Sequence, residues 1–206
     1  MNFSLSSKAI ASTKADCLVI GLPEKGTWPE STTQADEALD GLIKTLQKNG
    51  DLSGKNATTR TVPLSNQPWS RVVVVGTGND SERTQATYRK ALIAMVGALK
   101  DGPSKSALIT LTDTAVTGTD AVSSEEARLN LIGRTLEEQL YTFHDYKSDK
   151  PAARKLNKLV VTASGSGKGL KDAFNPGLAT VRGLNFTRDL GNTPPTICPQ
   201  DFRAHQ

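Results

Sequence analysis

Arg71-Val72-Val73-Val74-Val75 is the most apolar run in this chain of 206 residues, and it decides the fold class. Its four consecutive valines are β-branched, which favours a strand. Because no polar residue alternates with them, both faces of this strand are expected to be buried, as in a sheet with helices on both sides. The sequence therefore predicts a layered α/β domain in which residues 71–75 form a central strand.

Two strands and one helix are predicted before this run. Residues 16–21 are short and apolar, which indicates a buried strand, and residues 58–62 indicate a second strand that stops at Pro63. Between them, apolar residues recur at helical spacing from residue 33 to residue 48. One helix is therefore expected there, ended by Asn49-Gly50 in a left-handed conformation.

The alternation of helices and strands continues after the valine run. Further elements are expected at residues 82–100 (helix), 106–111 (strand), 123–142 (helix), 156–163 (strand) and 170–190 (helix). Ser123 and Glu126 have the spacing of a capping box at the start of the third of these. The last helix is expected to turn Leu178, Val181, Leu184 and Leu190 inward, and Pro176 either starts or kinks it. The fold class is therefore α/β, a layered mostly parallel or mixed sheet flanked by helices.

The composition limits where the protein works. No apolar stretch approaches the roughly 20 residues that a transmembrane helix needs, and the N-terminus lacks a secretory signal. Cys17 and Cys198 are isolated in the sequence, so they do not form a disulfide framework. A cytoplasmic protein with no membrane partner is expected.

The net charge of +4 is unevenly distributed. Residues 151–206 carry 8 Lys and Arg against 3 Asp and Glu, so the basic excess lies in the last quarter. Such a split marks a nucleic-acid patch, a surface that meets acidic protein, or an ordinary solvated or interdomain face. The last of these is favoured.

Two glycine clusters raise the question of a nucleotide site. Gly76-Thr77-Gly78 follows the valine run, but Ser81 stands where the dinucleotide fingerprint requires its third glycine or alanine. A tight turn after the strand is favoured. In Gly165-Ser166-Gly167-Lys168, the first glycine of a phosphate-binding loop is replaced by Thr162, and Gly169 replaces the Ser or Thr that holds magnesium.

No catalytic set of residues can be recognised. His144 and His205 are the only histidines, and neither belongs to a His-Glu-x-x-His motif. The two cysteines lack metal-ligand spacing, and Ser166 is not flanked as a nucleophile elbow requires. No catalytic, cofactor-binding or metal-binding residue is therefore assigned to this chain.

One segment near the C-terminus carries a resemblance to a known family. It is Arg188-Asp189-Leu190-Gly191-Asn192-Thr193-Pro194-Pro195-Thr196-Ile197-Cys198. It resembles bacterial leucyl (cytosol) aminopeptidases, in which a long helix ends in Lys/Arg-Asp-Leu-x-Asn and a Pro-containing stretch leads into the catalytic domain. Thr196 departs from the family, which often has Asn there. Looser likenesses at residues 2–4, 17–21, 50–55 and 72–78 extend the resemblance over essentially the whole chain.

The resemblance implies a macro-type α/β fold for this N-terminal domain. It also implies that the parent enzyme is a two-domain, two-metal hydrolase (Mn or Zn) that releases N-terminal residues, leucine among them, from peptides. The parent is expected to be a homo-hexamer, and some bacterial relatives bind DNA. The family's metal ligands and catalytic groups lie in the C-terminal domain, beyond Gln206.

Three parts of the chain are therefore expected. Residues 1–165 form an N-terminal accessory domain, residues 166–191 a linker helix, and residues 192–206 the start of a truncated catalytic domain. The segment from Pro199 to Gln206 begins like a helix but is too short to be stable alone. The isolated chain is expected to be inert. The alternatives are a DNA-binding accessory module and a free-standing macro-type nucleotide-binding domain.

Overall fold

A single six-stranded sheet organises the protein. The computed structural model describes residues 1–65, 67–117, 122–144, 154–165 and 168–194. The strands are β1 (Asn2–Ser6), β2 (Cys17–Lys25), β3 (Thr59–Pro63), β4 (Arg71–Asn79), β5 (Ser106–Ile109) and β6 (Lys158–Thr162). They lie in the order β1-β6-β5-β2-β4-β3, and all neighbours are parallel except β3 and β4. The expected mixed α/β sheet is confirmed.

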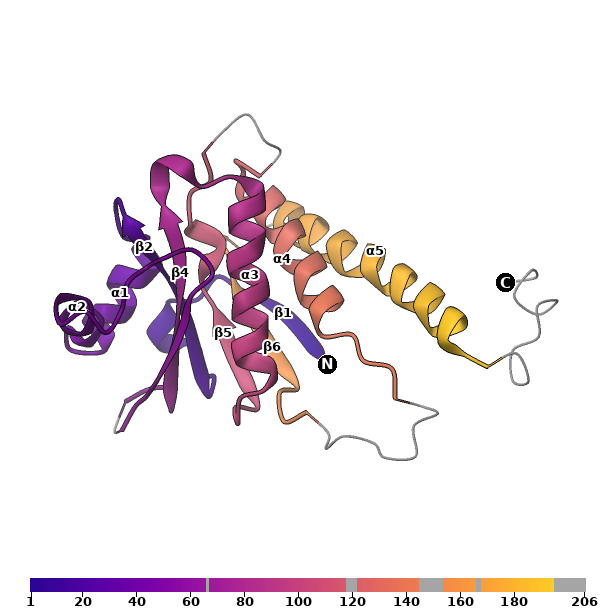
Figure 1. Cartoon of the computed structure of the whole chain (residues 1–206), viewed down its shortest axis with the longest axis horizontal. Helices are drawn as coiled ribbons and strands as arrows, with labels where there is room; N and C mark the ends of the chain where they lie inside the picture. The colour runs from indigo at the N-terminus through magenta and orange to yellow at the C-terminus, as the bar shows by residue number, and fades with distance from the viewer. Residues whose placement is uncertain (66, 118–121, 145–153, 166–167, 195–206) are drawn as a thin grey trace.

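Helices cover both faces of this sheet (Figure 1). They are α1 (Glu30–Ala38), α2 (Leu42–Lys48), α3 (Gln85–Lys100), α4 (Glu125–Gln139) and α5 (Lys168–Asn192), with short 3-10 turns η1 (Ile10–Ser12), η2 (Asp80–Glu82) and η3 (Leu111–Asp113). Helices α1 and α2 lie on one face, and α3, α4 and α5 lie on the other. Among the residues described, no helix combines the length and apolar character that a membrane crossing requires.

The valine run contributes to two separate cores. Val73 and Val75 pack in the core under α3, α4 and α5, whereas Val72 and Val74 pack in the core under α1 and α2. All four are at most 3% exposed, so the predicted burial on both faces is confirmed. Strand β4 is an interior strand, although it lies next to the edge strand β3 rather than at the middle of the sheet.

The single helix predicted over residues 33–48 is wrong. The chain forms α1 and α2 instead, and between them Asp40 and Gly41 have φ values of 55° and 77°. The side chain of Asp36 stabilises the break, because one of its oxygens accepts hydrogen bonds from the amides of Ile43 and Lys44 at 2.8 and 3.1 Å. Gly50 has a φ of 85°, as predicted for the residue after the helix.

Two helices start at other caps than the sequence predicts. The predicted capping box of Ser123 and Glu126 is wrong, because Ser124 is the N-cap and accepts a hydrogen bond from the amide of Ala127. Helix α3 begins after Thr84, whose side chain forms a capping box with Thr87, and residues 80–82 form η2 instead. In each case a Ser or Thr one or two positions after the predicted start of the helix caps its first turn.

The tight turn predicted at Gly76-Thr77-Gly78 is also wrong, because these residues continue strand β4. A side chain at Gly76 would collide with the carbonyl oxygen of Lys55, so this glycine allows residues 54–58 to lie directly against the strand. The amide of Gly76 donates to Thr58 and the amide of Gly78 donates to Gly54. The glycines therefore serve a close approach of two backbone segments.

Helix α5 differs from its prediction in two ways. Pro176 lies inside the helix, so it does not start it. Leu178 and Val181 are buried as predicted and Leu190 is half-buried, but Leu184 is 52% exposed. The first half of α5 packs closely on α4, where an ideal Cβ at Gly177 would lie 2.5 Å from the carbonyl oxygen of Asn130. Residues 145–153, between α4 and β6, lie outside the described residues, as do Ser166 and Gly167.

Candidate functional site at the carboxyl edge of the sheet

The largest cavity described, about 610 Å³, lies where the parallel strands end. Its walls come from the residues after β1, β5 and β6 and from the first turns of α1 and α4. After β2 the chain passes to α1 on one face of the sheet, and after β5 it passes to α4 on the other. Ligands of open α/β sheets bind at such a switch point, which makes this cavity the candidate site.

The short turn η3 connects the two helices that flank the cavity. The carbonyl oxygen of Thr112 accepts a hydrogen bond from Nε of Arg128 on α4 at 2.6 Å. The next residue, Asp113, accepts from the amide and the hydroxyl of Ser31 on α1 at 2.7 and 2.9 Å. Two consecutive residues therefore fix the starts of α1 and α4 relative to each other.

Arg128 is a cation held in place by backbone carbonyls. Besides Thr112, the carbonyls of Val122 and Ser123 accept from its Nη1, the latter at 2.5 Å. The ion pairs between described residues join Arg83 to Asp80, Arg89 to Glu138 and Arg182 to Glu137, so none of them includes Arg128. Three neutral acceptors fix the guanidinium without neutralising it.

Three carboxylates also line this cavity. Asp113 is an exposed residue at the outer edge of the cavity. Partial burial of its carboxyl group nevertheless raises the pKa of that group, and the hydrogen bonds from Ser31 partly oppose the rise. The negative charge of nearby Glu30 raises that pKa further. A third carboxylate, Glu125, accepts from both the amide and the hydroxyl of Ser164. Acidic and basic groups thus line one cavity at different places.

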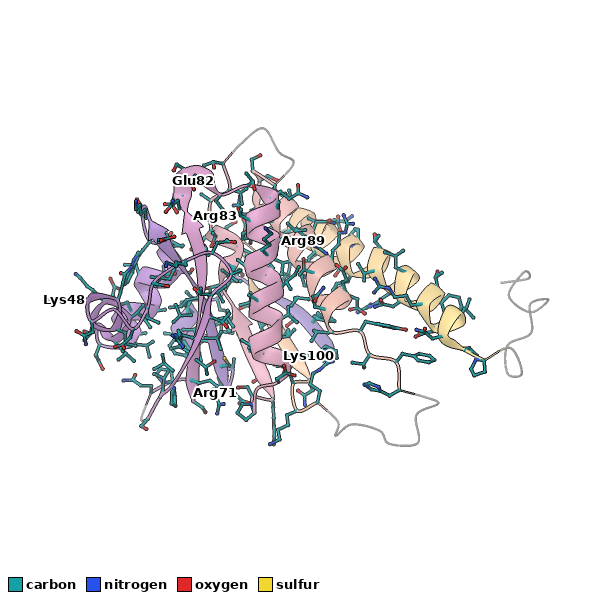
Figure 2. The ribbon with its side chains drawn as sticks, in the orientation of Figure 1. Lys48, Arg71, Glu82, Arg83, Arg89 and Lys100 are labelled. Carbon is teal, nitrogen blue, oxygen red and sulfur yellow. The ribbon has the colours of Figure 1, made fainter. Side chains whose placement is uncertain are left out.

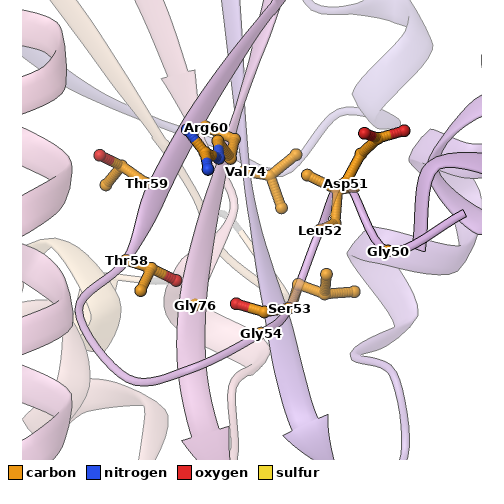
Figure 3. A pocket seen from close by; sticks show the side chains of 11 residues that line it. Gly50, Asp51, Leu52, Ser53, Gly54, Thr58, Thr59, Arg60, Val74 and Gly76 are labelled. Carbon is orange, nitrogen blue, oxygen red and sulfur yellow. The ribbon is translucent and has the colours of Figure 1, made fainter.

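A smaller cavity of about 320 Å³ lies beside the edge strand β3 (Figure 3). The loop after α2 curves around it, and Leu52, Leu22 and Val74 supply apolar surface. Asp51 and Arg60 lie at its margin, and no ion pair between described residues joins them. This cavity has room for a small apolar group but holds no arrangement of a nucleophile and a base.

The space beside Gly76 and Gly78 is occupied by the protein itself. Arg83, labelled in Figure 2, is 3% exposed. It donates to the carbonyls of Thr77, Gly78 and Ala115 and to the carboxylate of Asp80. The cavity next to it measures only about 130 Å³, below the roughly 300 Å³ at which ligand pockets begin. The geometry gives no support to a dinucleotide site here.

The remaining candidates from the sequence do not assemble into a site. His144 lies after α4, away from the cavity lining, whereas His205, Cys198, Ser166 and Gly167 lie outside the described residues. Burial raises the pKa of the Cys17 thiol to about 11, so it is a poor nucleophile. Within the described ranges, no group of three His, Cys, Asp or Glu residues could hold a metal ion. The residues present do not fit a metal centre, and no metal-dependent step is assigned to them.

Sequence reasoning missed the residues that do come together. Arg128, Asp113 and Glu30 lie in three separate segments, and each stands just beyond the carboxyl end of a parallel strand or in the first turn of the helix that follows. A position just after a predicted parallel strand is the signal in the sequence that could have identified these residues, because such residues converge on one edge of the sheet.

Both a family model and the sequences of individual known proteins match this chain. The family model described as "Cytosol aminopeptidase family, N-terminal domain" matches residues 19–150. Cytosol aminopeptidase of Pseudomonas aeruginosa is 34% identical over 208 residues, and the probable cytosol aminopeptidase of Halorhodospira halophila is 33% identical over 210 residues. Each match covers 100% of this chain but only 41% of the relative.

Solved structures show the same fold. A tomato leucine aminopeptidase mutant superposes with a TM-score of 0.71 at 20% identity, covering 96% of this chain and 39% of that one. The bottromycin maturation enzyme BotP in complex with Mn superposes with a TM-score of 0.63 at 20% identity, covering 93% and 35%. Both matches again involve less than half of the longer protein.

Proposed function

Because the chain belongs to the cytosol aminopeptidase family and corresponds to its N-terminal domain, we propose that it serves as the non-catalytic domain of an aminopeptidase. The whole enzyme releases N-terminal residues from peptides, leucine among them. The chain spans 41% of the length of its curated relatives. In this proposal the chemistry belongs to the part of the enzyme that the domain does not include. The task of the domain is then to hold that part in place.

One observation carries this proposal: from Pro176 to Gly191, the outward face of α5 bears no charge. Exposed positions along this face are Pro176, Ala179, Thr180, Gly183, Leu184, Phe186, Thr187 and Gly191. Leu184 and Phe186 are 52% and 51% exposed, and apart from Met1 they are the large apolar side chains most exposed among the described residues. Exposed apolar surface of this kind marks a contact with another protein surface.

The charged residues of α5 after Pro176 contact α4 and the residue Tyr141 that follows it. Arg182 pairs with Glu137, with 3.4 Å between Nε and Oε1. Asp189 accepts a hydrogen bond from the hydroxyl of Tyr141 at 2.7 Å, and the guanidinium of Arg188 lies 5.6 Å from the centre of the Tyr141 ring. Arg182, with 57% of its side chain exposed, and Arg188 therefore flank the outward face, and the face between them carries no charged side chain.

The polar groups on the outer face are also satisfied within the helix. The hydroxyls of Thr180 and Thr187 donate to the carbonyls of Pro176 and Gly183 at 2.8 and 3.2 Å. Small residues recur four positions apart, at Ala179, Gly183 and Thr187, which gives the groove into which another helix packs. The face is suited to close packing against the remainder of the enzyme.

This proposal divides the chain into residues 1–165 as the accessory domain, 166–191 as the linker helix and 192–206 as the start of the catalytic domain. Of the last segment, residues 195–206 lie outside the described residues. Two divalent ions, Mn or Zn, are proposed for the catalytic domain; the manganese complex of the structurally similar BotP supports this. A cytoplasmic homo-hexamer is proposed for the whole enzyme, and the names of the relatives support the cytoplasmic location.

The first test is an assay of the 206-residue chain with leucine p-nitroanilide and added manganese. No turnover is expected, and metal-dependent release of nitroaniline by the chain alone would contradict the non-catalytic role. A second test replaces the corresponding 41% of Pseudomonas aeruginosa cytosol aminopeptidase with this chain. The chimera is expected to hydrolyse the substrate.

The chimera also tests the α5 face. Phe186→Asp is expected to lower activity or assembly at least tenfold, because it places a charge in an apolar contact. Thr45→Asp, at an exposed position of α2 on the other side of the sheet, adds the same charge and is expected to have no effect. Equal activity of the two variants would show that the α5 face is not a packing surface.

A further inference from the structure

The cavity at the carboxyl edge lies apart from the outward face of α5, and the proposed domain contact leaves it without a role. We propose that this cavity binds a small zwitterion, an amino acid or short peptide with a free ammonium and a free carboxylate. Arg128 holds the carboxylate, and Glu30 and Asp113 hold the ammonium. The cavity and its charges support this inference independently of the proposed function.

Arg128 has the properties of a carboxylate receptor. Its Nε and Nη1 donate to three backbone carbonyls, which fix the plane of the guanidinium, and no ion pair between described residues uses its charge. The remaining nitrogen, Nη2, makes no hydrogen bond within the described part of the chain. Nη2 therefore keeps its two N–H donors for a carboxylate, and the fixed guanidinium keeps its charge.

Glu30 and Asp113 have the properties of an ammonium receptor. They lie close enough that the charge of Glu30 raises the pKa of Asp113, so a cation between them relieves their repulsion. Ser31 occupies one acceptor position on each oxygen of Asp113, and each carboxylate oxygen has a second position available. Glu30 is exposed at the start of α1, and among the described residues its carboxylate accepts a hydrogen bond only from Gln34, at 2.9 Å.

The two receptors come from opposite walls of the cavity. Thr112 holds Arg128 on the α4 side, and the following residue, Asp113, holds Ser31 on the α1 side. The ligand therefore lies across η3, with its carboxylate toward α4 and its ammonium toward α1. A volume of about 610 Å³ falls in the range of small-molecule pockets, about 300–1,000 Å³, and accommodates a peptide of two residues.

The charge balance argues against a simple anion. The ionisable side chains of the lining are Lys8, Arg128, Glu30, Asp113 and Glu125, two cations and three anions. Glu125 is engaged by Ser164, and Lys8 is exposed at the rim. A phosphate or a nucleotide would bring more negative charge to a lining that is already net negative, whereas a zwitterion satisfies both signs.

A zwitterion of this kind has the chemistry of an aminopeptidase substrate or product. No group of His, Cys, Asp or Glu among the described residues could hold a metal ion, so the role proposed for this cavity is binding alone. Occupancy would therefore report the supply of peptides or free amino acids to the enzyme. This consequence rests on the proposed function, but the binding itself does not.

The test is a titration of the ¹⁵N-labelled 206-residue chain with Leu-Leu, followed by NMR. Saturable shifts are expected at the amides of Ser31, Asp113 and Arg128. N-acetyl-Leu-Leu lacks the ammonium and Leu-Leu-amide lacks the carboxylate, so each is expected to bind at least tenfold more weakly. Shifts that are equal for all three ligands, or absent for Leu-Leu, would overturn the proposal. Tighter binding of inorganic phosphate or ADP at the same amides would overturn it as well.

Two variants assign the roles. Glu30→Gln, at an exposed position, is expected to weaken Leu-Leu at least fivefold and to leave the weak binding of N-acetyl-Leu-Leu unchanged. Its control is Glu126→Gln, which removes the same charge from the exposed first turn of α4 without lining the cavity. Arg128→Gln is expected to abolish the preference for Leu-Leu over its amide. If Arg128→Gln perturbs the fold, the comparison of Glu30→Gln with Glu126→Gln alone tests the proposal. Equal affinities of these two variants for Leu-Leu would contradict it.

Discussion

Substitution by alanine is expected to have opposite effects on stability at two glycines of helix α5. At Gly177 an added Cβ would lie 2.5 Å from the carbonyl oxygen of Asn130 on α4, whereas at Gly183 nothing lies within 4 Å. Both positions are helical, so alanine removes the same excess of unfolded-state freedom from each. Gly177→Ala and Gly183→Ala therefore differ only in what the methyl group meets.

The magnitudes follow from these contacts. Replacing glycine by alanine inside a helix stabilises by about 0.5–1 kcal/mol, and this whole gain is expected for Gly183→Ala. At Gly177 the methyl group must push α4 and α5 apart, and overpacking of this kind costs about 1–3 kcal/mol. The net expectation for Gly177→Ala is a loss of about 1–2 kcal/mol. Gly133→Ala is expected between the two, because its Cβ would lie 3.0 Å from the carbonyl oxygen of Phe174.

Urea denaturation of the 206-residue chain, followed by circular dichroism, measures the free energy of unfolding of each variant. The midpoint is expected to rise for Gly183→Ala and to fall for Gly177→Ala, at unchanged slope. If both substitutions stabilise equally, α5 does not pack on α4 as closely as described, and the fixed direction of the linker helix is refuted.

Three further results are expected. Arg83→Met leaves the buried acceptors around it unpaired and should cost about 3 kcal/mol in urea denaturation, whereas Arg89→Met, which breaks a half-exposed ion pair, should cost less than about 1 kcal/mol. Folding raises the pKa of the Cys17 thiol from 9.0 to about 11, so the stability that its neutral form contributes is complete below pH 9 and is lost as the pH rises to 11. Relative to Cys17→Ala, the free energy of unfolding of the wild type should therefore fall by about 2–3 kcal/mol between pH 9 and pH 11, as measured by urea denaturation at each pH. Tyr141→Phe removes the hydrogen bond to Asp189 and should speed hydrogen exchange at residues 185–192 about fivefold, corresponding to roughly 1 kcal/mol, without affecting exchange in β4.

The layered fold was predictable because its strongest signals are local. Four consecutive valines require burial on both faces, and the structure supplies a core on each side. The break between α1 and α2 was not predictable in this way. Apolar spacing continues across residues 39–41, and the break depends on Asp36 capping α2 from seven residues earlier in the chain. Helical periodicity does not report such a contact.

The exposure of Leu184 illustrates the same limit. Its spacing from Val181 and Leu178 places it near the buried side of α5, but α4 ends at Gln139 and the second half of α5 packs through Asn185 and Asp189 instead. Sequence patterns identify an apolar face, and only the arrangement of the neighbouring helix shows whether that face is covered.

The candidate site was beyond sequence reasoning for a different reason. Glu30, Asp113 and Arg128 belong to no motif, and they meet because η3 bonds to α1 through a side chain and to α4 through a carbonyl. A carbonyl acceptor has no sequence signature, since every residue carries one. The motifs that the sequence did offer, around Gly76 and Gly165, failed at their discriminating positions.

The orientation of charges on α5 separates two functions that composition leaves open. A basic C-terminal quarter fits either a DNA-binding patch or an interdomain face. A helix that binds DNA directs its cations outward to the phosphates, but in the second half of α5 Arg182 pairs with Glu137 and Arg188 lies over the Tyr141 ring, although both residues stay exposed. The outward face between these two arginines is uncharged and contains Leu184 and Phe186. Such a face loses little on leaving water, so on this helix the geometry favours contact with another protein domain over contact with DNA.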